Sequence, residues 1–171
     1  MLGVNFRTQK GSHMPGQGSR CFLMVKARAW MCALPLEDVE ETMRPLPITP
    51  VSSAPAFVRG VSLVRGQSAP VVDLAVLLGG EPGAPGPTAR FVSLRVVGGR
   101  LALEVDAVLG LRWLEQAALD EVPPLLRATA HGHLDSLGSL DGQLMAVLDA
   151  AHLVPEDLWA RLDASAGKAS A

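Results

Sequence analysis

Ala54–Leu78 reads APAFVRGVSLVRGQSAPVVDLAVLL, and this stretch carries the pattern that decides the fold. An apolar run at Val61–Val64 reaches a turn at Arg65-Gly66-Gln67, and a second run returns at Ala69–Val72. Two such runs around a glycine-containing turn predict a β-hairpin. Asp73 then stands where it would cap a short apolar helix, and Asp149 stands at the equivalent position later in the chain. The arginine of the turn lies beside apolar strands, so we expect it to have an acidic partner.

The same pattern returns later in the chain. Gly66 to Asp73 corresponds to Gly142 to Asp149 at an offset of 76 (142 − 66 and 149 − 73), and Phe22–Val39 can be laid on Phe91–Val108 at an offset of 69 (91 − 22). An internal repeat of this kind predicts two similar units. Short strands separated by frequent turn signals are typical of small β-barrels, so we expect two barrels packed side by side.

Three further hairpins are predicted from pairs of apolar runs around short turns. Their paired strands are Phe22–Ala27 with Trp30–Leu34, Arg90–Val97 with Arg100–Val105, and Leu134–Leu140 with Gln143–Leu148.

Two segments predict helix, and one predicts a loose connection. Leu36–Met43 has apolar residues at i, i+3 and i+7, which predicts a short amphipathic helix. Pro155–Leu162 has proline at its start and apolar residues on one face, which predicts a terminal helix. Gly79–Pro87 holds four glycines and three prolines in nine residues, so we expect a mobile connection between the units.

The opening stretch resembles the most recognisable segment of the CheW family of bacterial chemotaxis coupling proteins. The resemblance rests on Pro55-Ala56-Phe57-Val58-Arg59-Gly60, Leu63-Val64-Arg65-Gly66 and Ala69-Pro70-Val71-Val72-Asp73-Leu74, and it covers roughly residues 21 to 153. One departure is Leu63, because the family usually has asparagine there. Any polar contact of that asparagine is therefore absent.

The resemblance implies both a fold and a function. The fold would be all-β with short helices, arranged as two small five-stranded β-barrels packed side by side. The function would be that of a non-catalytic, cytoplasmic scaffold without cofactors, which couples chemoreceptors to the histidine kinase CheA in a chemosensory array. Its partners would be the cytoplasmic tip of a chemoreceptor and the kinase's regulatory domain. The alternative is a CheW-like decoy or cross-talk adaptor that binds receptor or other signalling proteins without engaging a kinase.

The family pattern also places an acid and an arginine at Glu41 and Arg65. One interpretation is a structural ion pair that orients the two barrels. The other is that both residues border the groove that a receptor helix enters, and the two interpretations are compatible because arginine has several donors. The predicted partner-binding residues are Val39, Glu41, Gly60, Leu63 and Arg65.

Composition and motifs argue against other functions. A net charge of −2 gives no electrostatic reason to expect nucleic acid or an anionic membrane surface as a partner, and no apolar run approaches the roughly 20 residues of a membrane span. His131, His133, Asp135 and His152 lack the ligand set of a structural zinc site. No nucleophile elbow or phosphate loop is present, so we expect neither a metal site nor an enzyme.

The expected domain boundaries follow from these patterns. Residues 1–18 are interpreted as a disordered leader outside the domain, because Gly11-Ser12-His13-Met14 is typical of a cloning-vector remnant. The CheW-like domain is expected over 19–163, with barrel one mainly in 21–78, barrel two mainly in 90–150 and the terminal helix in 155–162. A disordered tail is expected over 164–171. Cys21 and Cys32 are expected to be reduced thiols.

Overall fold

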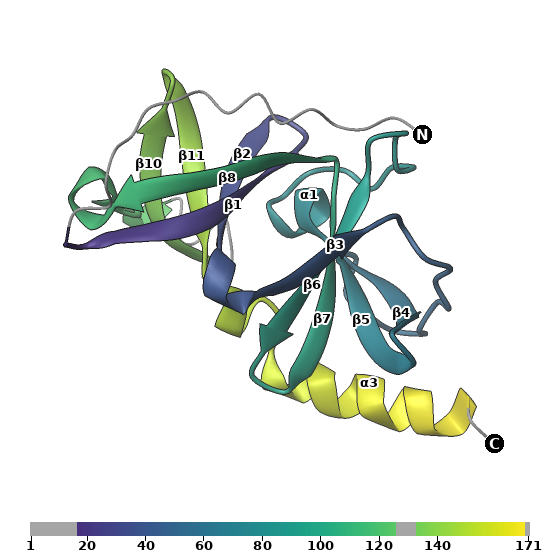
Figure 1. Ribbon diagram of the computed structural model, residues 1–171. Coiled ribbons are helices and arrows are strands. Elements are labelled where there is room, and N and C mark those ends of the chain that lie inside the picture. Colours follow the sequence, from purple (N-terminus) through teal and green to yellow (C-terminus); the bar gives the residue numbers. More distant parts are fainter. Residues whose placement is uncertain (1–16, 126–132, 170–171) are drawn as a thin grey trace.

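Two β-sheets form the body of the protein in the computed structural model, which describes residues 17–125 and 133–169 (Figure 1). One sheet has six strands in the order β8-β1-β2-β11-β10-β9, and the other has five in the order β3-β6-β7-β5-β4. We call them sheet A and sheet B. Sheet A contains β1 (Ser19–Ala27), β2 (Trp30–Pro35), β8 (Ala107–Glu115), β9 (Asp120–Glu121), β10 (Leu134–Leu140) and β11 (Gln143–Leu148). Sheet B contains β3 (Val39–Met43), β4 (Val58–Val64), β5 (Gln67–Asp73), β6 (Arg90–Val96) and β7 (Gly99–Val105).

Helices are few and mostly short. The α-helices are α1 (Leu74–Leu77) and α3 (Glu156–Ala169), and the 3-10 turns are η1 (Leu36–Asp38), η2 (Gln116–Ala118) and η3 (Ala150–His152). The predicted all-β class with short helices is confirmed. The strand pairings leave both sheets open within the described residues, so they are sheets of six and five strands and not closed five-stranded barrels. No helix in the described part of the chain is long and apolar enough to cross a membrane.

The two halves of the chain exchange their first hairpins. The hairpin β1–β2 lies beside β11 in sheet A, and the hairpin β6–β7 lies beside β5 in sheet B. Barrel one was expected mainly from residues 21–78 and barrel two mainly from 90–150. Three of the five strands of sheet B and four of the six strands of sheet A come from these ranges, but each sheet also takes one hairpin from the other half. Turn composition specifies pairing within a hairpin, whereas pairing between hairpins depends on tertiary packing. The repeat alone did not contain that information.

The repeat does appear in the strand register. In sheet A, Ala33 of β2 lies opposite Val147 of β11 in a parallel pair. In sheet B, Ala102 of β7 lies opposite Val71 of β5, also in a parallel pair. Ala102 is equivalent to Ala33 at the offset of 69 (102 − 33), and Val147 is equivalent to Val71 at the offset of 76 (147 − 71). The two parallel pairs are therefore equivalent in the repeat. Both sheets are therefore assembled by the same rule, with equivalent hairpins joined in equivalent register.

A continuous apolar core joins both sheets and the terminal helix. Phe22 and Phe91, which are equivalent in the repeat, are almost completely buried in two smaller separate clusters, one in each sheet. Helix α3 adds Leu158, Trp159 and Leu162 to the largest buried cluster. Burial of this apolar surface is the main force that holds the two sheets and the helix together.

Local predictions had mixed outcomes. Asp73 and Asp149 cap α1 and η3 as expected, since they accept hydrogen bonds from the backbone N–H groups of Val76 (3.3 Å) and Ala151 (3.2 Å). The expected helix over Leu36–Met43 is wrong. Only Leu36–Asp38 is helical, and the rest is strand β3 because it pairs with β6.

The ends of the domain also differ from the prediction. Helix α3 continues to Ala169, so residues 164–169 are helical and the disordered tail expected there is wrong. Strand β1 begins at Ser19, where the domain was expected to begin. Residues 1–16 of the expected leader and residues 170–171 lie outside the described residues.

Candidate partner-binding site

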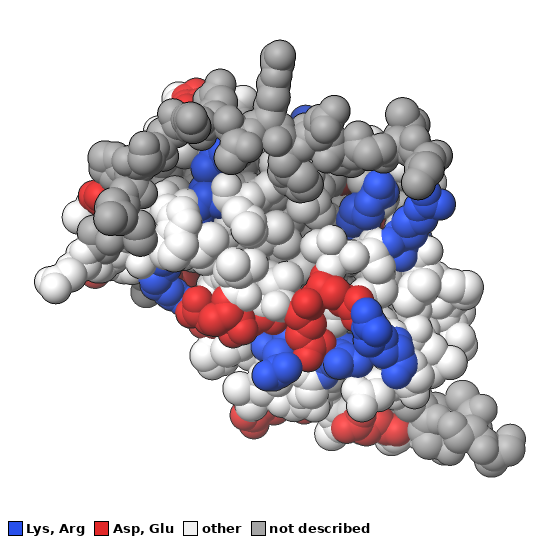
Figure 2. Space-filling model, in the orientation of Figure 1, with Lys and Arg blue, Asp and Glu red and all other residues white. Residues whose placement is uncertain are grey.

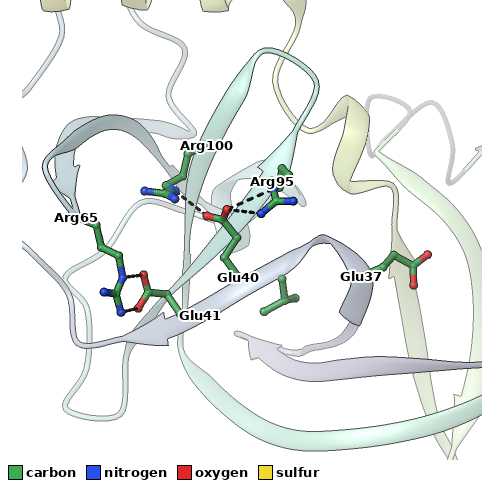
Figure 3. Close-up of a pocket in the computed structure, with 7 residues that line it drawn as sticks. Glu37, Glu40, Glu41, Arg65, Arg95 and Arg100 are labelled. Carbon is green, nitrogen blue, oxygen red and sulfur yellow. Dashed lines mark hydrogen bonds and ion pairs between the residues drawn. The ribbon is translucent and has the colours of Figure 1, made fainter.

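A β-bulge in strand β3 positions two adjacent carboxylates. Val39 lies opposite Leu94 and Glu41 lies opposite Ser93, so Glu40 is the extra residue of the bulge. A bulge re-aims side chains locally. Figure 3 shows Glu40 and Glu41 both directed from β3 toward a group of arginines.

Glu40 holds two arginines of the β6–β7 hairpin. Its carboxylate accepts hydrogen bonds from Arg100 Nε (2.6 Å), Arg95 Nη2 (3.2 Å) and Ser93 Oγ (3.0 Å). Arg95 and Arg100 lie directly opposite each other in the antiparallel pair, an arrangement in which like charges destabilise a sheet. Glu40 compensates this repulsion. The hydrogen bond from Arg100 is the main reason that the pKa of Glu40 lies below its usual value.

Glu41 and Arg65 form the predicted ion pair. Arg65 Nε donates to Glu41 Oε1 (2.5 Å) and Arg65 Nη2 donates to Oε2 (2.8 Å), which is bidentate geometry. These hydrogen bonds lower the pKa of Glu41 and raise the pKa of Arg65. The expected acidic partner is therefore present, and the pair is exposed, since 72% of the Arg65 side chain is accessible. Arg65 lies in the β4–β5 turn at φ +50° with Gly66 at φ +76°, and this places its side chain in solvent.

The ion pair also has a different structural role from the predicted one. Glu41 belongs to β3 and Arg65 to the β4–β5 turn, and β3 and β4 are the outermost strands of the same sheet B. The pair therefore links the two edges of one sheet. It does not orient one barrel against the other.

These charges line a pocket of about 410 Å³. We call it the charged pocket, and its lining residues are Glu37, Val39, Glu40, Glu41, Arg65, Arg95 and Arg100 (Figure 3). Figure 2 shows acidic and basic side chains gathered together over sheet B on this face of the molecule. Most of the charges neutralise one another, so the pocket offers paired charges with spare donors and not a field of one sign.

The structure brings together three of the five predicted partner-binding residues. Val39, Glu41 and Arg65 line the charged pocket. Leu63 lies outside it on β4, with 68% of its surface exposed. Gly60 is buried, and a Cβ there would lie 2.2 Å from the carbonyl oxygen of Thr49. Its evident role is this close approach of two backbone segments, and its contact with a partner stays a prediction.

Glu40, Arg95 and Arg100 were not among the residues predicted from the sequence. The predicted hairpin has Gly98-Gly99 as its turn, which would place Arg95 opposite Ala102. In the structure the turn is Val97-Gly98, and Arg95 lies opposite Arg100. Two facing arginines require a counter-charge, so a hairpin predicted with the turn at Val97-Gly98 would have pointed to the acid of the bulge.

Sheet A has an apolar feature at the position that corresponds to the charged pocket. Strand β8 is an edge strand and has a bulge in the equivalent place, where Leu109 stands in the position of Glu40 (109 − 40 = 69). Leu109, Leu111 and Trp113 are 49%, 51% and 58% exposed. We call these three residues the apolar row. In Figure 2 the surface near β8 that is not drawn in grey is mostly uncharged, and it is seen in the same view as the charges over sheet B.

The histidines contact the backbone and an acid. His133 Nδ1 lies 3.1 Å from the carbonyl oxygen of His152, and His152 Nδ1 lies 2.6 Å from Asp149 Oδ2. No group of three metal-binding side chains occurs within residues 17–125 and 133–169. His131 of the considered histidine group lies outside the described residues.

Comparison with known proteins gives a consistent result. Residues 21–157 match the family described as a CheW-like domain. The chain is 35% identical over 117 residues to protein FrzA of Myxococcus xanthus, covering 68% of this chain and 69% of FrzA. It is 28% identical over 117 residues to the chemotaxis protein CheW of Rhizobium meliloti, covering 65% of this chain and 72% of that protein. The crystal structure of the scaffolding protein TtCheW from Thermoanaerobacter tengcongensis superposes with a TM-score of 0.72 at 21% identity, covering 82% and 92% of the two chains.

Proposed function

The chain belongs to the CheW-like family, and from this premise we propose that it is a non-catalytic scaffold that couples chemoreceptors to a CheA-type histidine kinase in a chemosensory array. Its proposed partners are the cytoplasmic tip of a receptor and the regulatory domain of the kinase, and its proposed location is the cytoplasm. Coupling requires that one small protein bind two different partners at once.

The observation that carries the proposal is the chemical difference between two equivalent sheet edges. The bulge of β3 presents Glu40 in the charged pocket, whereas the bulge of β8 presents Leu109 in the apolar row. An exposed row of large apolar side chains on a sheet edge is a candidate docking surface. A partner that spans these two features would contact apolar and charged groups together.

An amphipathic helix of the receptor tip fits these two features best. Helices commonly dock by placing an apolar stripe on an apolar surface and polar residues beside it. In the proposed complex the stripe packs on Leu111 and Trp113, while polar groups of the helix reach the exposed edge of the charged pocket near Val39. The ion pair of Arg65 with Glu41 uses Nε and Nη2 of the guanidinium, so Nη1 can donate to a partner.

The kinase domain would bind elsewhere. Leu63 is exposed on β4, an edge strand of sheet B, and does not line the charged pocket. An exposed leucine on an edge strand suits a contact between two similar β-domains. We therefore propose Leu63 as a kinase contact, and individual contacts can be weak because an array is multivalent.

The test is a pair of binding measurements with purified receptor tip fragment and purified kinase regulatory domain. Trp113→Ser is expected to weaken receptor binding about 30-fold, the effect of a hot-spot residue worth about 2 kcal/mol. The same variant is expected to keep its affinity for the kinase domain. Leu144→Ser is the matched control, because Leu144 is 53% exposed and lies outside the apolar row.

Three outcomes would count against the proposal. Unchanged receptor binding by Trp113→Ser would remove the apolar row from the receptor site. Equal losses in Trp113→Ser and Leu144→Ser would indicate a general surface effect. Binding of the receptor tip without any binding of the kinase domain would favour the decoy or cross-talk adaptor instead.

A further inference from the structure

A buried pair of carboxyl groups lies in sheet B, away from both proposed docking surfaces. Asp73 of β5 lies opposite Glu104 of β7 in the parallel pair, so both side chains are on the same side of the sheet. The two residues are only 6% and 7% exposed. Two adjacent buried carboxylates repel each other unless cations or protons compensate them.

One arginine serves both acids. Arg59 Nη1 lies 3.1 Å from Glu104 Oε1 and 3.6 Å from Asp73 Oδ2. The second carboxyl oxygen of Glu104, Oε2, is buried and has no hydrogen-bond partner among the described residues. A buried ionised carboxylate with one unpaired oxygen is costly, whereas a protonated carboxyl is much less so.

The surrounding charges also favour a proton on Glu104. Three acids face this cluster, Asp73, Asp106 and Glu104 itself, but only two arginines, Arg59 and Arg28. Burial is the main factor that raises the pKa of Glu104. Asp73 and Asp106 raise the pKa further, and Arg59 and Arg28 oppose the rise. One proton on Glu104 balances the cluster.

The same arginines hold the connection between α1 and β6, residues 79–87. Arg59 Nη1 donates to the carbonyl oxygen of Gly83 (3.1 Å), and Arg28 Nη2 donates to that of Glu81 (3.3 Å). Arg28 lies so close that a Cβ at Gly83 would be 2.6 Å from its Nη2 atom. Arg59 therefore links Glu104 directly to the backbone of the connection.

We propose that Glu104 is a proton-linked latch for the 79–87 connection, which stays closed while Glu104 carries a proton and opens when Glu104 ionises and takes up water at Oε2. The sign follows from linkage. A carboxyl pKa that is raised in the closed form stabilises that form below the ordinary pKa of 4.5. This stabilisation is lost as the pH rises through the raised pKa.

The test combines a carboxyl titration with amide hydrogen exchange on the full chain. Reporter amides are Gly80, which donates to Ala75, and Ala89, which donates to Gly86. Their protection factors are expected to fall about tenfold per pH unit between pH 4.5 and the pKa measured for Glu104, and then to level off. Val92 in the core of sheet B is the reference amide and should not follow this curve.

Two variants keep the proposal falsifiable. Glu104→Gln has no proton to lose, so its reporter amides should show protection that does not change with pH. Asp73→Asn keeps a good helix cap but removes one repelling charge, so it should lower the pKa of Glu104. The pH range over which the protection factors fall should then be narrower than in the unmodified protein. Protection that is flat with pH in the unmodified protein, or a slope that persists in Glu104→Gln, would overturn the proposal. If Glu104→Gln does not fold, the proposal would be overturned by an Asp73→Asn variant whose protection factors fall over the same pH range as in the unmodified protein.

Discussion

Phe57 and His133 meet ring edge to ring face, with centroids 6.3 Å apart and planes at 64°. They are also equivalent residues of the repeat, since 133 − 57 = 76. The carbonyl oxygen of Phe57 accepts from Asp73 N (2.8 Å), and that of His133 accepts from Asp149 N (2.9 Å). Each residue precedes the second hairpin of its half, so this contact joins the two halves at matching positions.

The exchange of hairpins predicts a single cooperative unfolding unit. Each sheet contains strands from both halves, so a fragment of residues 17–87 or 88–169 lacks strands that its core requires. We expect each fragment alone to be unfolded by circular dichroism and amide NMR spectra, and the full chain to unfold in one transition with denaturant. A fragment with native-like dispersion of amide signals would contradict this prediction.

Substitution of Gly60 by alanine should destabilise the protein strongly. Gly60 has φ +143°, and a Cβ there would meet the carbonyl oxygen of Thr49 at 2.2 Å. Backbone strain of about 1–3 kcal/mol and a steric clash act together, so the free energy of unfolding should fall by at least about 2–4 kcal/mol in urea titrations. Gly86→Ala is the control, because a Cβ there would have open space around it and the change should be small. Equal effects of the two substitutions would refute the steric explanation.

Arg65→Ala should change the titration of Glu41 more than it changes stability. The bidentate hydrogen bonds of Arg65 lower the pKa of Glu41 below 4.5, so their stabilising effect is present above that pH and is lost as the pH falls through the lowered pKa. In Arg65→Ala the pKa of Glu41, measured by carbon NMR, should rise toward 4.5. A value that stays low in the variant would show that Arg65 is not the cause. Because the pair is exposed, stability near neutral pH should change much less than in Gly60→Ala.

Glu40→Gln should expose the repulsion between Arg95 and Arg100. Glu40 is the carboxylate that binds both arginines, and its side chain is 19% exposed. Loss of charged hydrogen bonds of this kind should cost about 1–3 kcal/mol in the free energy of unfolding. In a background with Arg95→Gln the same change should cost less, because one of the two facing charges is gone. If the costs of the two single substitutions add up to the cost of the double substitution within about 0.3–0.5 kcal/mol, the two sites are not coupled and this prediction fails.

The two cysteines should react differently with thiol reagents. Burial raises the pKa of Cys32 to about 12, which leaves almost no thiolate near neutral pH. Cys21 is partly exposed at the start of β1. The native protein should therefore label once by mass spectrometry, and the unfolded protein twice. Native Cys21→Ser should not label, and rapid labelling of that variant would contradict the burial of Cys32.

Features that depend only on neighbouring residues could be predicted from the sequence. The turns Arg65-Gly66 and Asp141-Gly142 both have positive φ at both positions, as two-residue hairpin turns require, and their composition predicted them. The caps at Asp73 and Asp149 were predicted for the same reason, since a cap depends on a side chain and a backbone N–H two or three residues away. The ion pair of Glu41 with Arg65 was expected from the family pattern, and its geometry confirms it.

How the hairpins combine, in contrast, depends on tertiary packing. Both halves contain similar apolar hairpins, and a buried strand such as β2 could pair with either copy on local grounds. The choice of β11 over β5 depends on the packing of one core around both sheets. Residues 39–43 became a strand for the same reason, because the edge of β6 satisfies their backbone groups. The charged pocket follows from that pairing, since only the docking of β3 on β6 places Glu40 between Arg95 and Arg100.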